Sequence, residues 1–133
     1  WAAMALRNGA RCISTDVCVP ISRLAECVEE TRADLAESDL VGPILGHVGD
    51  GNFHVLLVID MENEDEVARG KAFYKRLVHR ALAMEGTCTG EHGVGQGKMP
   101  YLETELGAAA VDAMRAIKLA LDPQNIMNPG KIV

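Results

Sequence analysis

The sequence is poor in aromatic residues, with one tryptophan, two tyrosines and two phenylalanines among 133 residues. Proteins that bind nucleic acids usually combine a concentrated basic face with aromatic side chains on which bases stack. Here the formal net charge is −6, and the basic residues between positions 69 and 80 are spread around one predicted helix. We therefore expect no nucleic-acid partner.

The sequence also has no CxxC pair and no long hydrophobic run. A disulfide framework is unusual in a chain that is long enough to bury its own core. No apolar run approaches the roughly 20 residues that span a bilayer, and no signal-peptide pattern is present. The sequence therefore predicts an intracellular protein whose four cysteines are reduced thiols, namely Cys12, Cys18, Cys27 and Cys88.

Hydrophobic residues recur with strand-like spacing in some segments and with helix-like spacing in others. The segments predict a strand at 12–19, a helix that ends near Ser38, a hairpin formed by the apolar runs 41–48 and 53–59, a helix at 64–85 capped by Asn63, a strand at 87–90 and a helix at 107–121. This order is that of a β-α-β-β-α-β unit. We therefore predict an α+β fold, with a ferredoxin-like antiparallel sheet, helices on one face and a C-terminal helical extension.

Two histidines flank the tip of the predicted hairpin. An Asp-Gly pair between apolar runs is typical of a two-residue type I′ turn. A turn centred on Asp50-Gly51 pairs residue 47 with residue 54, which would place His47 and His54 directly opposite each other on one face. A three-residue loop or a bulge would break this pairing. Two imidazoles in that arrangement can share one metal ion, although a cross-strand pair without an ion is the alternative.

A metal site needs a third ligand, and Glu91 is the best candidate. In a sheet of this order the last strand can end near the hairpin, so its carboxylate could complete a His₂Glu set. Three protein ligands leave coordination positions open, as in catalytic sites. His92 follows directly, and an imidazole, with an ordinary pKa of about 6.5, is a suitable proton acceptor beside a divalent ion.

Four segments carry a resemblance to a known family. They are STDVCVP at 14–20, GHVGDGNFH at 46–54, GTCTGEHGVGQGK at 86–98 and DPQNIMNPGK at 122–131. In their order and spacing they resemble the C-terminal part of the FAD-linked D-2-hydroxy acid dehydrogenases, and most nearly the cytochrome-type, flavin-dependent D-lactate dehydrogenases. The resemblance covers essentially the whole chain.

The resemblance implies a domain organisation. In that family an N-terminal FAD-binding domain precedes a cap domain that holds the metal and most of the substrate pocket. Residues 1–133, which begin with Trp1 rather than Met, would then be a single-domain fragment, with 1–100 as the ferredoxin-like cap portion and 101–133 returning to the FAD-binding domain. The resemblance also implies an electron acceptor such as cytochrome c or a quinone, in a mitochondrion or in a bacterial cytoplasm, there at most peripheral to the membrane.

The same resemblance implies roles for individual residues. His47, His54 and Glu91 would bind a divalent ion, Zn²⁺ or Mn²⁺. His92 would accept the substrate's proton, and Asn128 would contact FAD or simply form a turn. The activity implied is oxidation of D-lactate to the 2-oxo acid, with hydride transfer to flavin N5. The fragment alone is expected to be inactive.

The substrate of such an enzyme depends on the residues beside the metal. Relatives that act on D-2-hydroxyglutarate resemble this sequence but carry Lys at the position of Ser14 and Asn at that of Leu56. An apolar Leu56 suits a short side chain such as that of lactate, while glycolate oxidase subunits share the general pattern. Two alternatives belong to other classes, namely a non-catalytic ferredoxin-like metal-binding module and a metal-dependent hydrolase with the same His₂Glu set.

Overall fold

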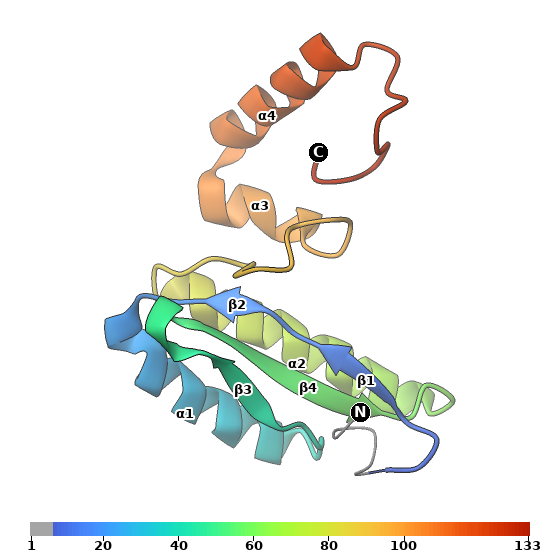
Figure 1. The fold of residues 1–133 in the computed structure, drawn as a ribbon. Helices are drawn as coiled ribbons and strands as arrows, with labels where there is room; N and C mark the ends of the chain where they lie inside the picture. The colour runs from blue at the N-terminus through green and yellow to red at the C-terminus, as the bar shows by residue number, and fades with distance from the viewer. Residues whose placement is uncertain (1–6) are drawn as a thin grey trace. The chain divides into compact units, whose positions relative to one another are not determined.

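The computed structural model describes residues 7–133, which form two compact units, one ending at Glu91 and the other beginning at His92. The first unit contains β1 (Arg11–Ser14), β2 (Val17–Cys18), α1 (Ile21–Glu37), β3 (Ile44–His47), a 3₁₀ turn (Val48–Asp50), β4 (Asn52–Ile59) and α2 (Glu64–Ala83). The second contains α3 (Met99–Leu106) and α4 (Ala108–Leu121) (Figure 1).

Strand β4 is the centre of the sheet in the first unit. It pairs antiparallel with β1 and β2 along one edge and with β3 along the other (Figure 1). Helix α2 packs against β2 and β4, and α1 packs against α2. The predicted α+β fold with an antiparallel sheet and helices is therefore confirmed.

Strand β4 is apolar along most of its length because nearly all of its side chains are buried in the core. Only Leu56 of this strand is half-buried, and its other residues are buried, which is typical of a strand covered on both faces. Helix α2 packs against β4, and Cys27 of α1 is also buried. The largest buried apolar side chains include Phe53, Val55, Leu57, Ile59, Phe73, Leu77 and Val78.

Local signals in the sequence located three of the four helices. Helix α1 ends at Glu37, beside the predicted Ser38, and α4 begins within one residue of its predicted start. Asn63 caps α2, because its side-chain oxygen accepts a hydrogen bond from the Glu66 amide at 3.1 Å. Helix α3 was not predicted, since only one of its eight residues is buried and its hydrophobic periodicity is correspondingly weak.

Two of the predicted strands differ from the structure. The strand expected at 12–19 is interrupted at Thr15 and Asp16, so that β1 and β2 are separate segments. The strand expected at 87–90 is reduced to one bridge between Thr87 and Cys18. Beyond Thr87 the backbone amides of Gly90 and Glu91 donate to the side chain of Asp16 instead of to a neighbouring strand.

The predicted register of the hairpin is wrong by two residues. In the structure residue 47 pairs with residue 52, and Leu45 pairs with His54. The loop is not a two-residue turn on Asp50-Gly51 but a 3₁₀ turn from Val48 to Asp50, closed by Gly51 at φ 73°. A Cβ on Gly51 would lie 2.0 Å from the Val19 carbonyl oxygen. Close packing against the segment around Val19 therefore determines the conformation of this loop.

A buried carboxylate connects the two helices of the first unit. Asp34 of α1 accepts hydrogen bonds from Arg76 and Arg80 of α2, the shortest at 2.6 Å from Arg76 Nη2. Burial raises the pKa of Asp34, but the hydrogen bonds from the two arginines outweigh it and hold the pKa below its usual value.

The pKa of Asp34 leads to a prediction about stability. A carboxyl group with a lowered folded pKa stabilises the fold above its unfolded pKa, about 3.9, and this contribution is lost as the pH falls through the folded pKa. We expect Asp34→Asn to lower the free energy of unfolding at pH 7 by about 3 kcal/mol, because two arginines lose their carboxylate partner. Below about pH 4 the difference from the unchanged protein should shrink.

Urea denaturation at a series of pH values measures this difference. The matched control is Asp112→Asn on α4, whose carboxylate is 71% exposed and pairs only with Arg115 three residues along the helix. Exposed pairs of this kind contribute about 0–1 kcal/mol, so the control should change little. A destabilisation by Asp34→Asn that is equally large at pH 3 and pH 7 would contradict the assigned role of the charge.

Candidate metal centre

His54 of β4 is held in one orientation by the backbone. Its side chain is 6% exposed, and Nδ1 lies 2.9 Å from the carbonyl oxygen of Thr15. A carbonyl oxygen can only accept, so Nδ1 carries the hydrogen and donates it. Nε2 then faces the carboxylate of Glu91, with Oε1 at 3.0 Å.

The break between β1 and β2 explains why the Thr15 carbonyl is available. The hydroxyl of Thr15 accepts the hydrogen bond from the Val55 amide at 2.8 Å, while the Thr15 amide donates to the Val55 carbonyl at 3.0 Å. The hydroxyl thus replaces the backbone carbonyl in the ladder, and the carbonyl is left for His54. Sequence reasoning missed this role, although a threonine followed by an aspartate within a β-branched segment was the available signal.

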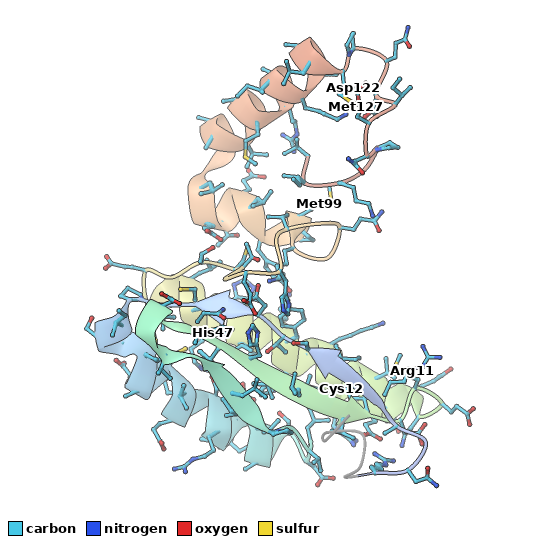
Figure 2. The ribbon with its side chains drawn as sticks, in the orientation of Figure 1. Arg11, Cys12, His47, Met99, Asp122 and Met127 are labelled. Carbon is cyan, nitrogen blue, oxygen red and sulfur yellow. The ribbon has the colours of Figure 1, made fainter. Side chains whose placement is uncertain are left out.

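His47 lies at the end of β3, where Figure 2 labels it. It is opposite Asn52, so it shares a face with His54 two residues further along β4. The two imidazole rings are 6.1 Å apart between centroids, with their planes at 86°. His47 Nε2 is 3.5 Å from Glu91 Oε2. The corrected register therefore still brings both histidines to one carboxylate, diagonally instead of directly across the hairpin.

The three predicted ligands fit a divalent cation. The ligand atoms of His47, His54 and Glu91 all lie within 4.8 Å of one another. Ligands at 2.0–2.2 Å from a tetrahedral ion are themselves separated by about 3.4 Å, close to the 3.0 and 3.5 Å between the imidazole nitrogens and the carboxylate. With the hydrogen of the ring on Nδ1, Nε2 of His54 offers a lone pair toward the Glu91 carboxylate, and both atoms can coordinate one cation.

The chemistry of these ligands limits the choice of ion. Two imidazole nitrogens and one carboxylate suit Zn²⁺, and imidazole with carboxylate also accommodates Mn²⁺. Three ligands from the chain leave coordination positions for a substrate.

Cys18 lies beside this site but is not suited to be a ligand. None of the four cysteines forms a disulfide within residues 7–133, and Cys18 lines a pocket together with His47, Asn52 and Glu91. Burial raises the pKa of the Cys18 thiol, and the carboxylates of Asp16 and Asp50 raise it further. The thiol therefore stays protonated at neutral pH, and it donates to the Asp50 carbonyl at 3.1 Å.

The other two predicted site residues belong to the second unit. His92 is exposed and follows Glu91 directly in the chain. Asn128 is exposed, has φ 48° and accepts a hydrogen bond from the Lys131 amide at 3.2 Å, which is turn geometry. It also lines a cavity of 710 Å³ between α4 and the C-terminal tail. The proton-accepting role of His92 and the flavin contact of Asn128 stay predictions.

Comparison with known proteins identifies the family. Residues 1–132 match the family described as FAD linked oxidases, C-terminal domain. The chain belongs to this family. As an FAD-linked oxidase C-terminal domain, it is 57% identical over its whole length to a probable mitochondrial D-lactate dehydrogenase from Danio rerio, and 47% identical to the mitochondrial D-lactate dehydrogenase (cytochrome) from Arabidopsis thaliana. It is also 42% identical, over 90% of the chain, to glycolate oxidase subunit GlcD from Bacillus subtilis.

The FAD-linked oxidase C-terminal domain spans about a quarter of each of these relatives. It covers 27% of the Danio protein, 24% of the Arabidopsis protein and 26% of the Bacillus protein. Within residues 7–133, no helix is both long enough and apolar enough to cross a membrane.

Proposed function

We propose that this chain is the substrate- and metal-binding part of a flavin-dependent dehydrogenase that oxidises D-lactate to its 2-oxo acid. The observation that carries the proposal is the approach of His47, His54 and Glu91 to one point, with ligand atoms within 4.8 Å, in a member of the FAD-linked oxidase family. The names of the Danio and Arabidopsis relatives, both D-lactate dehydrogenases, support D-lactate as the substrate.

The mechanism assigns a task to each of these side chains. His47, His54 and Glu91 hold a divalent cation, Zn²⁺ or Mn²⁺, and the Thr15 carbonyl keeps the His54 ring turned toward it. When bound, the cation supplies Lewis-acid polarisation of the C2 hydroxyl and carboxylate, and FAD supplies a two-electron hydride acceptor. His92 takes the hydroxyl proton.

The cross-strand pair of Ser14 and Leu56 supports a substrate with a short side chain. Ser14 of β1 lies directly opposite Leu56 of β4, on the face that also carries His54. Both residues were singled out in the sequence as positions where a distal carboxylate would be held by polar groups. Here the pair offers one hydroxyl and one half-buried isobutyl group, which suits the methyl group of lactate.

This pair provides a test of substrate choice. We expect the double substitution Ser14→Lys and Leu56→Asn to raise kcat/KM for D-2-hydroxyglutarate relative to D-lactate by about 10- to 100-fold, because hydrogen bonds to a charged group contribute about 1.5–3 kcal/mol. Steady-state kinetics with both substrates measures the ratio. The control is Cys12→Ser, an exposed residue of β1 two positions from Ser14, which should leave the ratio unchanged. An unaltered ratio in the double variant would contradict the role of the pair.

The second unit supports the proposal that the chain works beside a flavin-binding half. Helix α4 buries only Val111, while several of its large apolar side chains are exposed. Asp122 orders the tail that follows, accepting from the Ile126 and Met127 amides and from Lys118, and Figure 2 shows Asp122 and Met127 side by side. The exposed apolar residues of helix and tail include Ile117, Leu119, Leu121, Ile126 and Met127.

We place residues 1–100 in the substrate-binding cap, and residues 101–133 in contact with an N-terminal FAD-binding domain, where Asn128 lies near the flavin. An apolar surface of this kind is typical of an interface with another domain or protein. For the electron acceptor we propose a cytochrome such as cytochrome c, with a quinone as the alternative, and we propose a mitochondrial location. The name of the Arabidopsis relative includes cytochrome, and the names of both relatives include mitochondrial.

Flavin reduction in the full-length protein tests the function. We expect D-lactate to bleach the flavin absorption faster than glycolate or D-2-hydroxyglutarate, and the ion-free protein to be slow. If one of the other two acids is the fastest substrate, the family assignment stands and D-lactate is wrong. Activity on an ester or amide without flavin would instead support a hydrolase, and tight metal binding with no flavin reduction would support a non-catalytic module.

A further inference from the structure

Asp16 has a carboxylate with no exposed surface in the break between β1 and β2. It accepts hydrogen bonds from Thr89 Oγ1 at 2.9 Å, from the Gly90 amide at 2.9 Å and from the Glu91 amide at 3.2 Å. These three donors donate to Asp16 Oδ2, while Asp16 Oδ1 accepts a hydrogen bond from Asn52 Nδ2 at 2.8 Å. Burying a carboxylate is costly unless hydrogen bonds compensate it, and these donors provide that compensation.

Three of these donors belong to residues 89–91, which the structure does not form into a strand although the sequence predicted one at 87–90. The segment is joined to the sheet by the Thr87–Cys18 bridge, and then by the side chain of Asp16. The contact is close, because a Cβ on Gly90 would lie only 1.8 Å from Asn52 Nδ2. The Asp16 carboxylate therefore accepts the backbone hydrogen bonds of Gly90 and Glu91, as the carbonyl groups of a neighbouring strand do elsewhere in the sheet.

The fourth donor connects the same carboxylate to the strand of the histidine. Asn52 begins β4, two residues before His54. Asp16 Oδ1 also lies 3.7 Å from His54 Nδ1, where a negative charge favours the tautomer with hydrogen on Nδ1. One buried side chain thus links the backbone of Glu91 to β4, and the 3.0 Å approach of Glu91 Oε1 to His54 Nε2 depends on that link.

We propose that Asp16 is a positioning residue of the metal centre, which acts through Glu91 by holding its backbone against the strand that carries His54. This inference rests on the proposed function, because the divalent ion that Glu91 would bind is part of that proposal. Asp16 itself does not need to touch the ion or the substrate.

A double-mutant cycle tests whether Asp16 acts through Glu91. The Zn²⁺ affinity of the full-length protein is measured by chelator competition for the unchanged protein, Asp16→Asn, Glu91→Gln and the double variant. Asparagine keeps the shape of the Asp16 side chain, but it replaces one acceptor oxygen with an amide NH₂ group, which cannot accept hydrogen bonds from the donors that surround Asp16. We expect Asp16→Asn to weaken Zn²⁺ binding about 10- to 100-fold, as for other residues that orient ligands. The double variant should bind no more weakly than Glu91→Gln alone.

Additive losses in the cycle would overturn the proposal, because Asp16 would then act independently of Glu91. Two further variants separate positioning from general stability. Asp34→Asn removes another buried carboxylate and should lower stability while keeping the Zn²⁺ affinity. Thr89→Val removes a single donor to Asp16 at nearly constant volume, and it should weaken Zn²⁺ binding in the same direction but less.

Hydrogen exchange of the ion-free protein provides a second measurement. We expect the amides of a peptide covering residues 88–91 to exchange faster in Asp16→Asn, while peptides from α2 stay protected. Unchanged protection at residues 88–91 would overturn the positioning role. If the unchanged protein does not bind Zn²⁺ or Mn²⁺ at all, the proposed metal centre is wrong, and the exchange result still decides whether Asp16 holds Glu91.

Discussion

Replacing His54 with glutamine is expected to remove the metal ion and to slow flavin reduction by D-lactate about 1000-fold. Glutamine retains a polar group of similar length, but it has no imidazole nitrogen to face Glu91, 3.0 Å away in the structure. Lewis-acid stabilisation by a bound ion contributes several kcal/mol to a transition state, and about 4 kcal/mol corresponds to this factor in rate. Metal analysis of the purified protein and stopped-flow measurement of flavin reduction provide the two readouts.

A matched control is available on α2. His79→Gln makes the same chemical change at an exposed residue of α2, and it should leave metal content and rate unchanged. If His54→Gln keeps both its metal and its rate, the proposed centre is wrong. If the rate falls but the unchanged protein never contained metal, His54 acts in the reaction without a metal ion, and the proposed metal centre is wrong.

Replacing His92 with alanine is expected to slow flavin reduction by about 100- to 10,000-fold, the usual contribution of a positioned general base. Unlike the change at His54, it should leave the metal content intact, because His92 is not among the three proposed ligands. His92 is exposed, so its removal opens no cavity in the core and the stability should hardly change.

Added imidazole distinguishes a proton acceptor from a residue that only shapes the site. If His92 removes the hydroxyl proton, millimolar imidazole should restore part of the rate of His92→Ala. The control is His79→Ala, which should be neither slowed nor accelerated by imidazole. A normal rate for His92→Ala would assign the proton to another group, and loss of metal from this variant would make His92 a ligand.

Patterns between near neighbours in the chain were sufficient to predict α1, the hairpin, α2 and α4 in their order, but not α3 or the reduction of the last strand to one bridge. The cap of α2 at Asn63, the end of α1 near Ser38 and the apolar strand β4 follow from hydrogen bonds and side-chain spacing within a few residues. The two histidines were expected on one face because a hairpin brings residues on either side of its loop together, and the structure also brings Glu91 within 4.8 Å of them. Their binding of a metal ion stays a prediction.

The register of that hairpin could not be predicted from the loop residues. Asp50-Gly51 is compatible with a two-residue turn, but the structure has a four-residue loop whose tip packs beside the Val19 carbonyl. A shift of two residues leaves each side chain on its own face, since side chains alternate with period two. For this reason His47 and His54 share a face in both the predicted and the observed register. In the structure His47 lies diagonally across from His54 instead of directly opposite it.

By itself, the sequence determined the fold class, helices α1, α2 and α4, and the family that the chain resembles, because each depends on local spacing or on motifs of a few residues. Only the tertiary structure decided that the Thr15 carbonyl orients His54 and that Asp16 holds Glu91 in place of a last strand. The physical reason is distance along the chain: residues 16 and 91 meet through hydrogen bonds across 75 positions. No local pattern reports such a contact.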